Sequence, residues 1–312
     1  MPRQSVSGWL ILDKPKGYTS AEAVSRVKAI YSVKKVGHAG TLDPLASGLL
    51  PIAIGEATKT VYLIMKGLKI YRFSIAWGEE RSTDDLEGHV IKRSLKRPTA
   101  MEVKRLLKKY IGFIFQVPPQ FSAVRIGGIR AYTLAREGKK IDLIARNVFV
   151  KRLDLIGMNL EGHFSFEIEC GKGTYVRALA RDLGRDLGCY GYIVDLRRIE
   201  VCPFKEDNLV TFTMLEKADS LSSLEREKLP FLKKNFAALD SFLLQTSLAF
   251  MNIKKYLLSD EQAISIREGC SVLLKEKEDT VFDEVCVKYQ EKILAIGSLK
   301  HGLFQPKRLF KF

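Results

Sequence analysis

The residues best suited to chemistry lie in a polar loop rich in glycine, VGHAGTLDPLASGLLPIAIG, at residues 36–55. Its first half holds one imidazole, His38, and one carboxylate, Asp43. Pro44 fixes its own φ and disfavours helical geometry at Asp43, so we expect Asp43 on an extended loop. The apolar run that follows predicts a buried strand, and a constrained loop beside a rigid strand can position a reactive group.

An aspartate before proline in such a segment is most often only a turn residue. The whole string, however, resembles nearly residue for residue the catalytic loop of the bacterial TruB family of tRNA pseudouridine synthases. That family isomerises uridine 55 in the T-loop of tRNA. The resemblance implies that Asp43 is the catalytic carboxylate and that His38 binds substrate, where it fills or braces the stack that the base vacates. Spacing alone indicates a constrained loop and no particular reaction.

Two further segments, one before this loop and one after it, resemble the same family. SGWLILDKPKGYTS, at residues 7–20, matches its first motif, in which Lys14 is either a phosphate contact or, more commonly, a solvated turn lysine. Tyr71 begins the alternating strand expected over residues 69–78, and by periodicity it is the first aromatic residue of a core face. It also matches the family's active-site tyrosine, whose ring packs on the target base and whose hydroxyl is a candidate base.

The segment GTYVR, followed by an expected helix, matches the family arginine that pairs with the catalytic aspartate, and this role falls on Arg177. An adjacent guanidinium favours the ionised form of a buried aspartate, and a bidentate pair fixes its orientation. Tyr175 matches a substrate-contacting tyrosine, and Leu196 a leucine that lines the base pocket. Arg177, Arg181 and Arg185 share one helical face, and such a stripe is usually exposed to solvent.

The polar segment EERSTDDLEG, at residues 79–88, departs from the family pattern. Counted from Gly78, Ser82 stands where the family has its first aspartate, whereas the second aspartate is retained as Asp85. A further difference is Arg125, where the family generally has lysine, which keeps the charge but not the geometry. No contact of the family's first aspartate is therefore carried over to this chain.

The charge balance favours a polyanionic partner. The chain of 312 residues carries a formal net charge of +15. From Leu239 onward 11 basic residues face 10 acidic ones, whereas the first 238 residues carry 40 against 26. Five cysteines without a CxxC pair and four scattered histidines argue against a disulfide framework and against a metal site.

The resemblance implies an α+β fold with a mixed, largely antiparallel sheet flanked by helices, the pseudouridine synthase fold. Capping boxes at Thr19–Glu22 and Thr99–Glu102 predict two helix starts, a further helix is expected over residues 56–66, and a helical connector over residues 218–235. We expect a catalytic domain over residues 1–238 and a small β-barrel, PUA-like RNA-binding domain over residues 239–312. Its strands are expected at residues 270–274, 281–289, 292–297 and 308–312, with turns at Gly297 and Pro306.

The resemblance implies isomerisation of uridine 55 to pseudouridine on a flipped-out base, with the T-arm of tRNA as partner. The reaction involves no redox change and no carried group, so we expect no cofactor and no metal. We further expect a cytoplasmic monomer without a membrane segment. Whether the carboxylate attacks C1′ or removes a 2′ proton stays open. Two alternatives are a catalytically inactive tRNA-binding or folding protein and a guide-dependent RNA pseudouridine synthase. Together Asp43, Tyr71 and Arg177 argue against the first.

Overall fold

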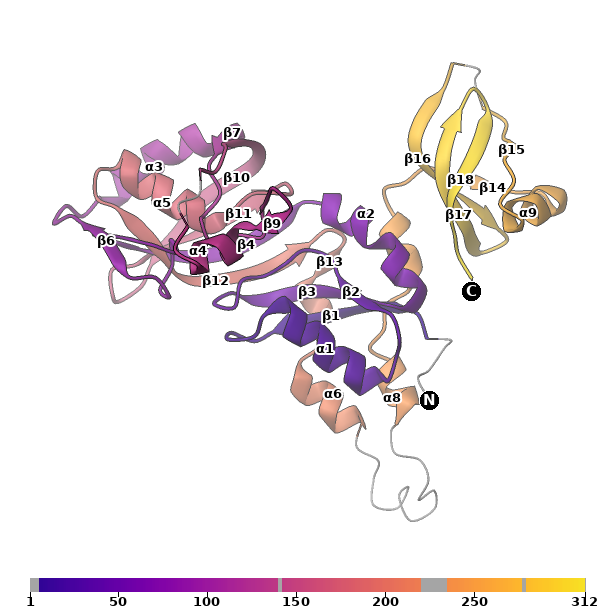
Figure 1. The fold of residues 1–312 in the computed structure, drawn as a ribbon, viewed down its shortest axis with the longest axis horizontal. Coiled ribbons are helices and arrows are strands. Elements are labelled where there is room, and N and C mark those ends of the chain that lie inside the picture. The colour runs from indigo at the N-terminus through magenta and orange to yellow at the C-terminus, as the bar shows by residue number, and fades with distance from the viewer. Residues whose placement is uncertain (1–5, 140–141, 220–234, 277–278, 312) are drawn as a thin grey trace, which may run out of the picture.

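The computed structural model describes residues 6–139, 142–219, 235–276 and 279–311, which form two sheets with flanking helices (Figure 1). The larger sheet has nine strands in the order β1-β3-β12-β4-β11-β10-β7, with β2 beside β3 and β13 beside β12. Its pairs are antiparallel except β3 with β12, which run parallel. The strands are β1 (Gly8–Lys14), β2 (Val36–His38), β3 (Ser47–Ile54), β4 (Lys69–Trp77), β7 (Gly112–Gln116), β10 (Arg146–Met158), β11 (Phe164–Cys170), β12 (Gly191–Val201) and β13 (Phe204–Lys205).

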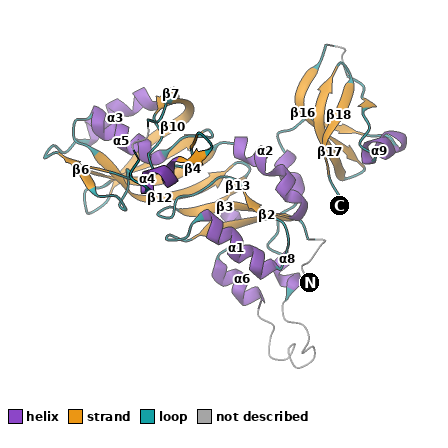
Figure 2. Cartoon of the chain, viewed as in Figure 1, coloured by secondary structure: helices purple, strands orange, loops and turns teal. Residues whose placement is uncertain are grey.

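Two of the expected helix starts are confirmed. The hydroxyl of Thr19 accepts from the amide of Glu22 and the Glu22 carboxylate accepts from Thr19, and Thr99 and Glu102 repeat the arrangement. Figure 2 shows the helices against the sheets. They are α1 (Ser20–Tyr31), α2 (Val61–Lys66), α3 (Ala100–Leu107), α4 (Ala131–Arg136), α5 (Val176–Asp186), α6 (Phe212–Asp219), α8 (Phe236–Asp240) and α9 (Asp260–Arg267), with 3-10 turns η1 (Gly55–Thr60), η2 (Lys108–Tyr110), η3 (Glu206–Asn208) and η4 (Thr246–Phe250).

The large sheet is covered on both faces near β1 and β3. One face packs against α1, α3, α5, α6 and α8, and its core includes Leu50, Phe73, Leu179 and Leu215. The opposite face of β1 and β3, with the buried Trp9, is covered by η1, α2 and η4. The strand expected over residues 69–78 is confirmed as β4, which buries Phe73 but leaves Tyr71 only partly buried.

The helix expected over residues 56–66 is confirmed only in its second half. Its first half is the 3-10 turn η1, which begins at Gly55 with φ +60°. Thr58 and Thr60 donate their hydroxyls to carbonyls three residues back, at 2.7 Å each, and these bonds accompany the tighter turn. Two small hairpins complete the region, β5 (Glu79–Arg81) with β6 (Val90–Arg93) and β8 (Arg125–Ile126) with β9 (Ile129–Arg130).

The smaller, C-terminal sheet is curled and fits a PUA-like unit (Figure 1). Its order is β14-β16-β17-β18-β15, formed by β14 (Lys255–Leu257), β15 (Val272–Leu273), β16 (Val281–Tyr289), β17 (Lys292–Lys300) and β18 (Leu303–Leu309). The expected last strand at residues 308–312 and the expected turns at Gly297 and Pro306 are wrong. Gly297 pairs with Pro306 inside the β17–β18 hairpin, whose turn lies at His301–Gly302, where both residues have positive φ.

The chain between the two sheets packs against the larger one. Leu239 belongs to its main core, Leu244 exchanges two backbone hydrogen bonds with Trp9 at 2.8 Å, and Ala249 packs on its other face. The smaller sheet then contacts η1, where Arg308 Nη1 donates to the Lys59 carbonyl at 2.7 Å. Most of the connector expected over residues 218–235 lies outside the described residues. No helix in the described part of the chain is long and apolar enough to span a membrane.

Gly48 is the position where the fold most directly requires glycine. Its φ is +97°, and a Cβ there would lie 2.3 Å from the carbonyl oxygen of Arg198 on β12. We expect Gly48→Ala to lower the free energy of unfolding by about 1–3 kcal/mol because of this strain and overlap. Urea unfolding measures it, with Gly157→Ala as control, since a Cβ at Gly157 meets nothing within 4 Å. Equal stability losses in both variants would contradict this explanation.

Candidate active site

The loop that carries Asp43 is held against α1 and the turn after β1. The Ser20 hydroxyl, at the start of α1, donates to the Leu42 carbonyl at 3.0 Å and accepts from the Leu42 amide at 2.9 Å. The Gly17 amide donates to the Pro44 carbonyl at 2.8 Å. Both neighbours of Asp43 are therefore fixed by hydrogen bonds, and the loop presents its carboxylate in one place.

Arg177 faces this carboxylate from the first turn of α5. Its Nε lies 2.8 Å from Asp43 Oδ2 and its Nη2 lies 3.0 Å from Oδ1, which is a bidentate pair. The Arg177 side chain is 6% exposed, whereas the Asp43 side chain is 33% exposed. The guanidinium is thus buried behind a carboxylate that still reaches solvent.

The Arg177 guanidinium donates four hydrogen bonds and faces a second carboxylate. Besides Asp43, Nη1 donates to the Thr83 carbonyl at 3.0 Å and Nη2 to the Phe121 carbonyl at 2.9 Å. Asp85 Oδ2 lies 3.3 Å from Nη1. Burial lowers the pKa of Arg177, but Asp43 and Asp85 outweigh burial and raise it. The arginine is therefore fixed in charge and in direction.

Two of the three arginines of the α5 stripe, Arg177 and Arg181, are buried, whereas such stripes are usually solvated and Arg185 is 47% exposed. Arg181 is 7% exposed, its Nη1 lies 3.1 Å from Asp84 Oδ2, and its Nη2 donates to the Val117 carbonyl at 2.8 Å. Arg185 binds Glu80 through Nε and Nη2, at 2.8 and 2.7 Å. Together with Arg177, these residues fasten the acidic segment after β4 to α5 (α5 and β4 in Figure 1). Ser82, in contrast, is bonded to His89 and not to an arginine.

Tyr71 lies next to a second buried arginine. It is the cross-strand partner of Arg198 on β12, and the Arg198 Cζ lies 5.9 Å from the centre of the Tyr71 ring. Leu196, 4% exposed, is on the same face of β12 and pairs with Phe73. Burial raises the pKa of the Tyr71 hydroxyl, and Arg198 acts in the opposite direction. The Tyr71 ring and Leu196 are thus neighbours on adjacent strands of one sheet face.

The other predicted site residues surround the same region. Tyr175, immediately before α5, is fixed by Gln116, whose side chain accepts from the Tyr175 amide at 2.8 Å and donates to its carbonyl at 3.0 Å. The Tyr175 side chain packs with Val124 and Ala131 in the segment after β7. His38 ends β2, and burial, helped by Arg198, lowers the pKa of its imidazole.

Lys14 is buried. It is not a solvated turn lysine, because it is 0% exposed. Its ammonium donates to the carbonyls of Pro15 at 2.9 Å and Tyr18 at 2.7 Å, and lies 3.5 Å from that of Pro44. Burial lowers the pKa of Lys14 to about 8, although Asp43 acts in the opposite direction. Lys14 therefore supports the turn beside the Asp43 loop.

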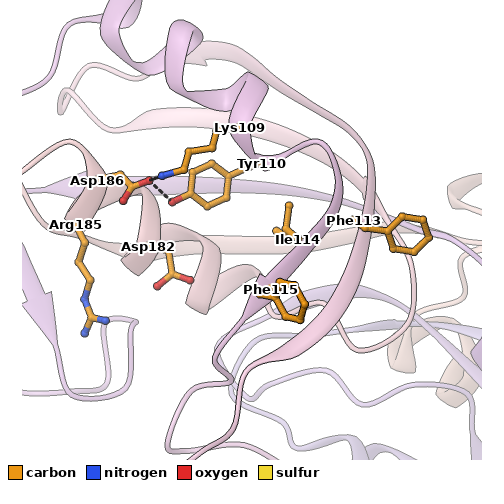
Figure 3. Close-up of a pocket in the computed structure, with 8 residues that line it drawn as sticks. All are labelled: Lys109, Tyr110, Phe113, Ile114, Phe115, Asp182, Arg185 and Asp186. Carbon is orange, nitrogen blue, oxygen red and sulfur yellow. Dashed lines mark hydrogen bonds and ion pairs between the residues drawn. The ribbon is translucent and has the colours of Figure 1, made fainter.

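A separate hollow of about 420 Å³ lies beside β7 and the second half of α5. Figure 3 shows Asp186 accepting from Lys109 Nζ and Tyr110 Oη, at 2.7 and 2.9 Å, while Phe113 points away from α5. None of the predicted site residues lines this hollow. This hollow therefore lies apart from the predicted site residues.

Sequence reasoning missed three residues that hold this arrangement together. Gln116 is 2% exposed and ends a strand, and no feature of the sequence distinguishes it from other polar residues. Asp84, 6% exposed, lies in the acidic segment whose changed pattern at Ser82 was noted. Arg198 closes the DLRR segment, but β12 also carries Asp195, Arg197 and Glu200, so the sequence does not single Arg198 out.

Comparisons with known proteins agree over nearly the whole chain. The model of the TruB family pseudouridylate synthase N-terminal domain matches residues 28–176, and that of the tRNA pseudouridylate synthase B C-terminal domain matches residues 177–249. The tRNA pseudouridine synthase B of Bartonella henselae is 55% identical and covers 99% of both chains. That of Brucella ovis is 52% identical, covering 98% of this chain and 96% of its own.

The fold is also shared with solved structures. A chain of a Cbf5–Nop10–Gar1 complex superposes with a TM-score of 0.72 at 22% identity, covering 97% of this chain and 85% of its own. A chain of an H/ACA RNP bound to a substrate RNA superposes with a TM-score of 0.70 at 20% identity, covering 98% and 85%. At this identity the likeness shows the fold alone.

Asp84 gives the fold a measurable pH dependence. Burial raises its pKa from 3.8 to about 6, although Arg181 acts in the opposite direction. Between these values the folded protein keeps a proton that the unfolded chain has lost, so the free energy of unfolding falls as pH rises. We expect Asp84→Asn to remove this fall, which is on the order of 2 kcal/mol.

Urea unfolding of the wild type and the variant between about pH 4 and pH 7 measures the difference in slope. The constant offset that the variant suffers from losing the partner of Arg181 does not affect that slope. Asp154→Asn is the matched control, because the Asp154 side chain is 51% exposed. An Asp84→Asn variant whose stability falls as steeply as that of the wild type would show that Asp84 is not the group responsible.

Proposed function

The chain belongs to the TruB family of pseudouridylate synthases and isomerises uridine in tRNA to pseudouridine, and we propose that the Asp43 carboxylate carries out this reaction on uridine 55 of the T-loop. The observation that carries the proposal is the bidentate Asp43–Arg177 pair, in which a buried guanidinium holds a carboxylate open to solvent. A reaction at one carbon of a nucleotide needs such a group, close and fixed in direction.

The isomerisation breaks the bond between N1 and C1′ and forms a bond between C5 and C1′. The proton on C5 leaves, and N1 gains one, so atoms and electrons balance without an oxidant or a carried group. Asp43 either attacks C1′ or removes a 2′ proton to give a glycal-like intermediate. Neither route requires a cofactor or a metal ion.

The neighbouring residues take roles that follow from their places. A uridine inside a folded T-loop is out of reach, so the base is flipped out towards Asp43. Tyr71 and Leu196, adjacent on β4 and β12, form the surface on which the flipped base packs. His38, whose lowered pKa keeps its ring neutral, fills the vacated stack, and Tyr175 contacts the substrate from the start of α5.

The partner is the T-arm of tRNA, and the protein acts as a monomer in the cytoplasm. The net charge of +15 favours a polyanionic substrate. Identity of 55% with a curated tRNA enzyme supports a stand-alone tRNA synthase over a guide-dependent one, because the RNP chains share only 20–22%. The complete Asp43, Tyr71 and Arg177 set argues against an inactive tRNA-binding protein.

The packing between the two sheets indicates where the catalytic unit ends and the PUA-like unit begins. Because Leu239, Leu244 and Ala249 pack on the larger sheet, we place the end of the catalytic unit near Ile253 and not at residue 238. The remaining residues form the PUA-like unit, with 11 basic and 9 acidic residues after Ile253. We assign it contacts with tRNA outside the T-arm.

Replacing the carboxylate tests the proposal directly. Asp43→Asn keeps the shape of the side chain and removes its charge. We expect tRNA affinity to stay within a few-fold, while the single-turnover rate falls by about a thousandfold or more. The measurement is pseudouridine formation on an unmodified T-arm stem-loop, with Asp154→Asn as control for loss of an unrelated carboxylate. A variant with nearly wild-type activity would remove Asp43 from the chemistry.

Removing the PUA-like unit tests the division of labour. A chain ending at Ile253 is expected to keep its turnover on the T-arm stem-loop and to bind whole tRNA more weakly. The salt dependence of affinity should change little, because each lost phosphate contact lowers the slope by about 0.9 and the removed part is nearly neutral. Both substrates are compared across a salt series. If a soluble, folded truncated chain lost most turnover on the stem-loop, the C-terminal unit would belong to the active site.

A further inference from the structure

Arg198 is a buried cation that the chemistry above leaves without a role. It lies on β12 between Tyr71 on β4 and Gly48 on β3, and it is 1% exposed. Its Nε donates to the Leu49 carbonyl at 2.7 Å and its Nη2 to the Gly40 carbonyl at 3.0 Å. The guanidinium is therefore directed from the sheet towards the loop that carries Asp43.

No carboxylate of the described residues lies within 4.0 Å of the Arg198 guanidinium. This distinguishes it from Arg177 and Arg181, which are equally buried and are paired with aspartates. A buried charge without a partner of opposite sign destabilises a fold, and two carbonyls offset only part of this. Such a charge is useful where a negative charge forms transiently beside it.

The group beside it is the Tyr71 hydroxyl. The charged or ionisable groups that face Tyr71 are Arg198 on β12, Cys170 on β11 and Asp43 on the loop before β3. Burial raises the pKa of the Cys170 thiol to about 12, so this thiol stays neutral. Asp43 disfavours a negative charge on Tyr71, and Arg198 is the one cation among these that favours it.

The last step of the isomerisation needs a base at this place. Once C5 is joined to C1′, the proton on C5 must leave, and the electrons of the C5–H bond return to the ring. Tyr71 becomes a tyrosinate when its hydroxyl proton passes to N1, the ring nitrogen that gains a proton in the reaction, and the tyrosinate then takes the proton from C5. Its negative charge would form beside the Arg198 guanidinium, whose Cζ is 5.9 Å from the ring centre.

We propose that Arg198 is a positioning residue for Tyr71 and stabilises the tyrosinate that removes the proton from C5. The proposal rests on the assignment of the reaction to Asp43 and Tyr71 and adds the charge that the base requires. Arg198 does so through its charge and a side-chain hydrogen bond to Tyr71, in addition to the hydrogen bonds that it donates to the Leu49 and Gly40 carbonyls.

Two substitutions separate the charge of Arg198 from its hydrogen bonds. Arg198→Gln keeps N–H donors for the carbonyls and removes the charge, whereas Arg198→Lys keeps the charge and loses the planar guanidinium. Lys69→Gln is the matched control. Lys69 is also buried on this part of the sheet and donates to the carbonyls of Met65 and Gly67, but it is not among the groups that face Tyr71.

The first measurement is single-turnover pseudouridine formation on a T-arm stem-loop with uridine or 5-deuterated uridine at the target. We expect Arg198→Gln to slow the reaction by about a hundredfold and to give a larger isotope effect than the wild type, because proton removal becomes rate-limiting. Arg198→Lys and Lys69→Gln should keep the wild-type isotope effect. An unchanged isotope effect in Arg198→Gln would contradict the proposal.

The second measurement is the alkaline titration of tyrosinate absorbance, taken as the difference between each protein and the same protein carrying Tyr71→Phe. The midpoint of Tyr71 should rise in Arg198→Gln and stay in place in Arg198→Lys. If Arg198→Gln does not fold, the Tyr71 midpoint of Arg198→Lys alone tests the proposal. A purely structural role predicts a slow Arg198→Lys variant whose midpoint has moved, and that result would overturn the proposal.

The outcomes for Arg198 and for the proposed function are distinguishable. A wild-type protein that makes no pseudouridine on the stem-loop would refute the proposed reaction. An active wild type, together with Arg198 variants that leave both the isotope effect and the Tyr71 midpoint unchanged, would refute only the role of Arg198.

Discussion

The bidentate contact between Asp43 and Arg177 is the constraint on which the arrangement of the molecule depends. The two residues are 134 positions apart and belong to a loop before β3 and to the first turn of α5. Their two N–H···O contacts of 2.8 and 3.0 Å require both elements to be fixed independently. The loop is fixed by Ser20 and Gly17, and α5 by Gln116 and by its ion pairs with the acidic segment.

Buried positive charge is concentrated in the part of the sheet next to this pair. Arg198, Lys14 and Lys69 are buried within the same part of the sheet, and each donates to backbone carbonyls. Burial, together with the nearby Arg198, lowers the pKa of both Lys14 and Lys69 to about 8. A site built this way favours a carboxylate, and it favours the anions that form when a base leaves a sugar.

Part of this was predictable from sequence because it depends on local rules. The capping boxes predicted the starts of α1 and α3, alternation predicted β4, and the resemblance of the GTYVR segment implied the pairing of Arg177 with Asp43. Tertiary contacts decided the rest. An arginine stripe is usually solvated, and only the folded acidic segment buries Arg181 against Asp84. The burial of Lys14 was likewise not predictable, because its carbonyl acceptors come from a turn whose shape cannot be derived from residue spacing.

We propose that Arg177 acts by orienting Asp43 and not by holding RNA. The variant Arg177→Lys tests this role most directly, measured both for tRNA affinity and for the single-turnover rate on a T-arm stem-loop. Lysine keeps the positive charge but cannot form the bidentate contact, so affinity should change little while the rate falls much further. If affinity fell and the single-turnover rate stayed the same, Arg177 would be a phosphate contact and the account of this site would be wrong.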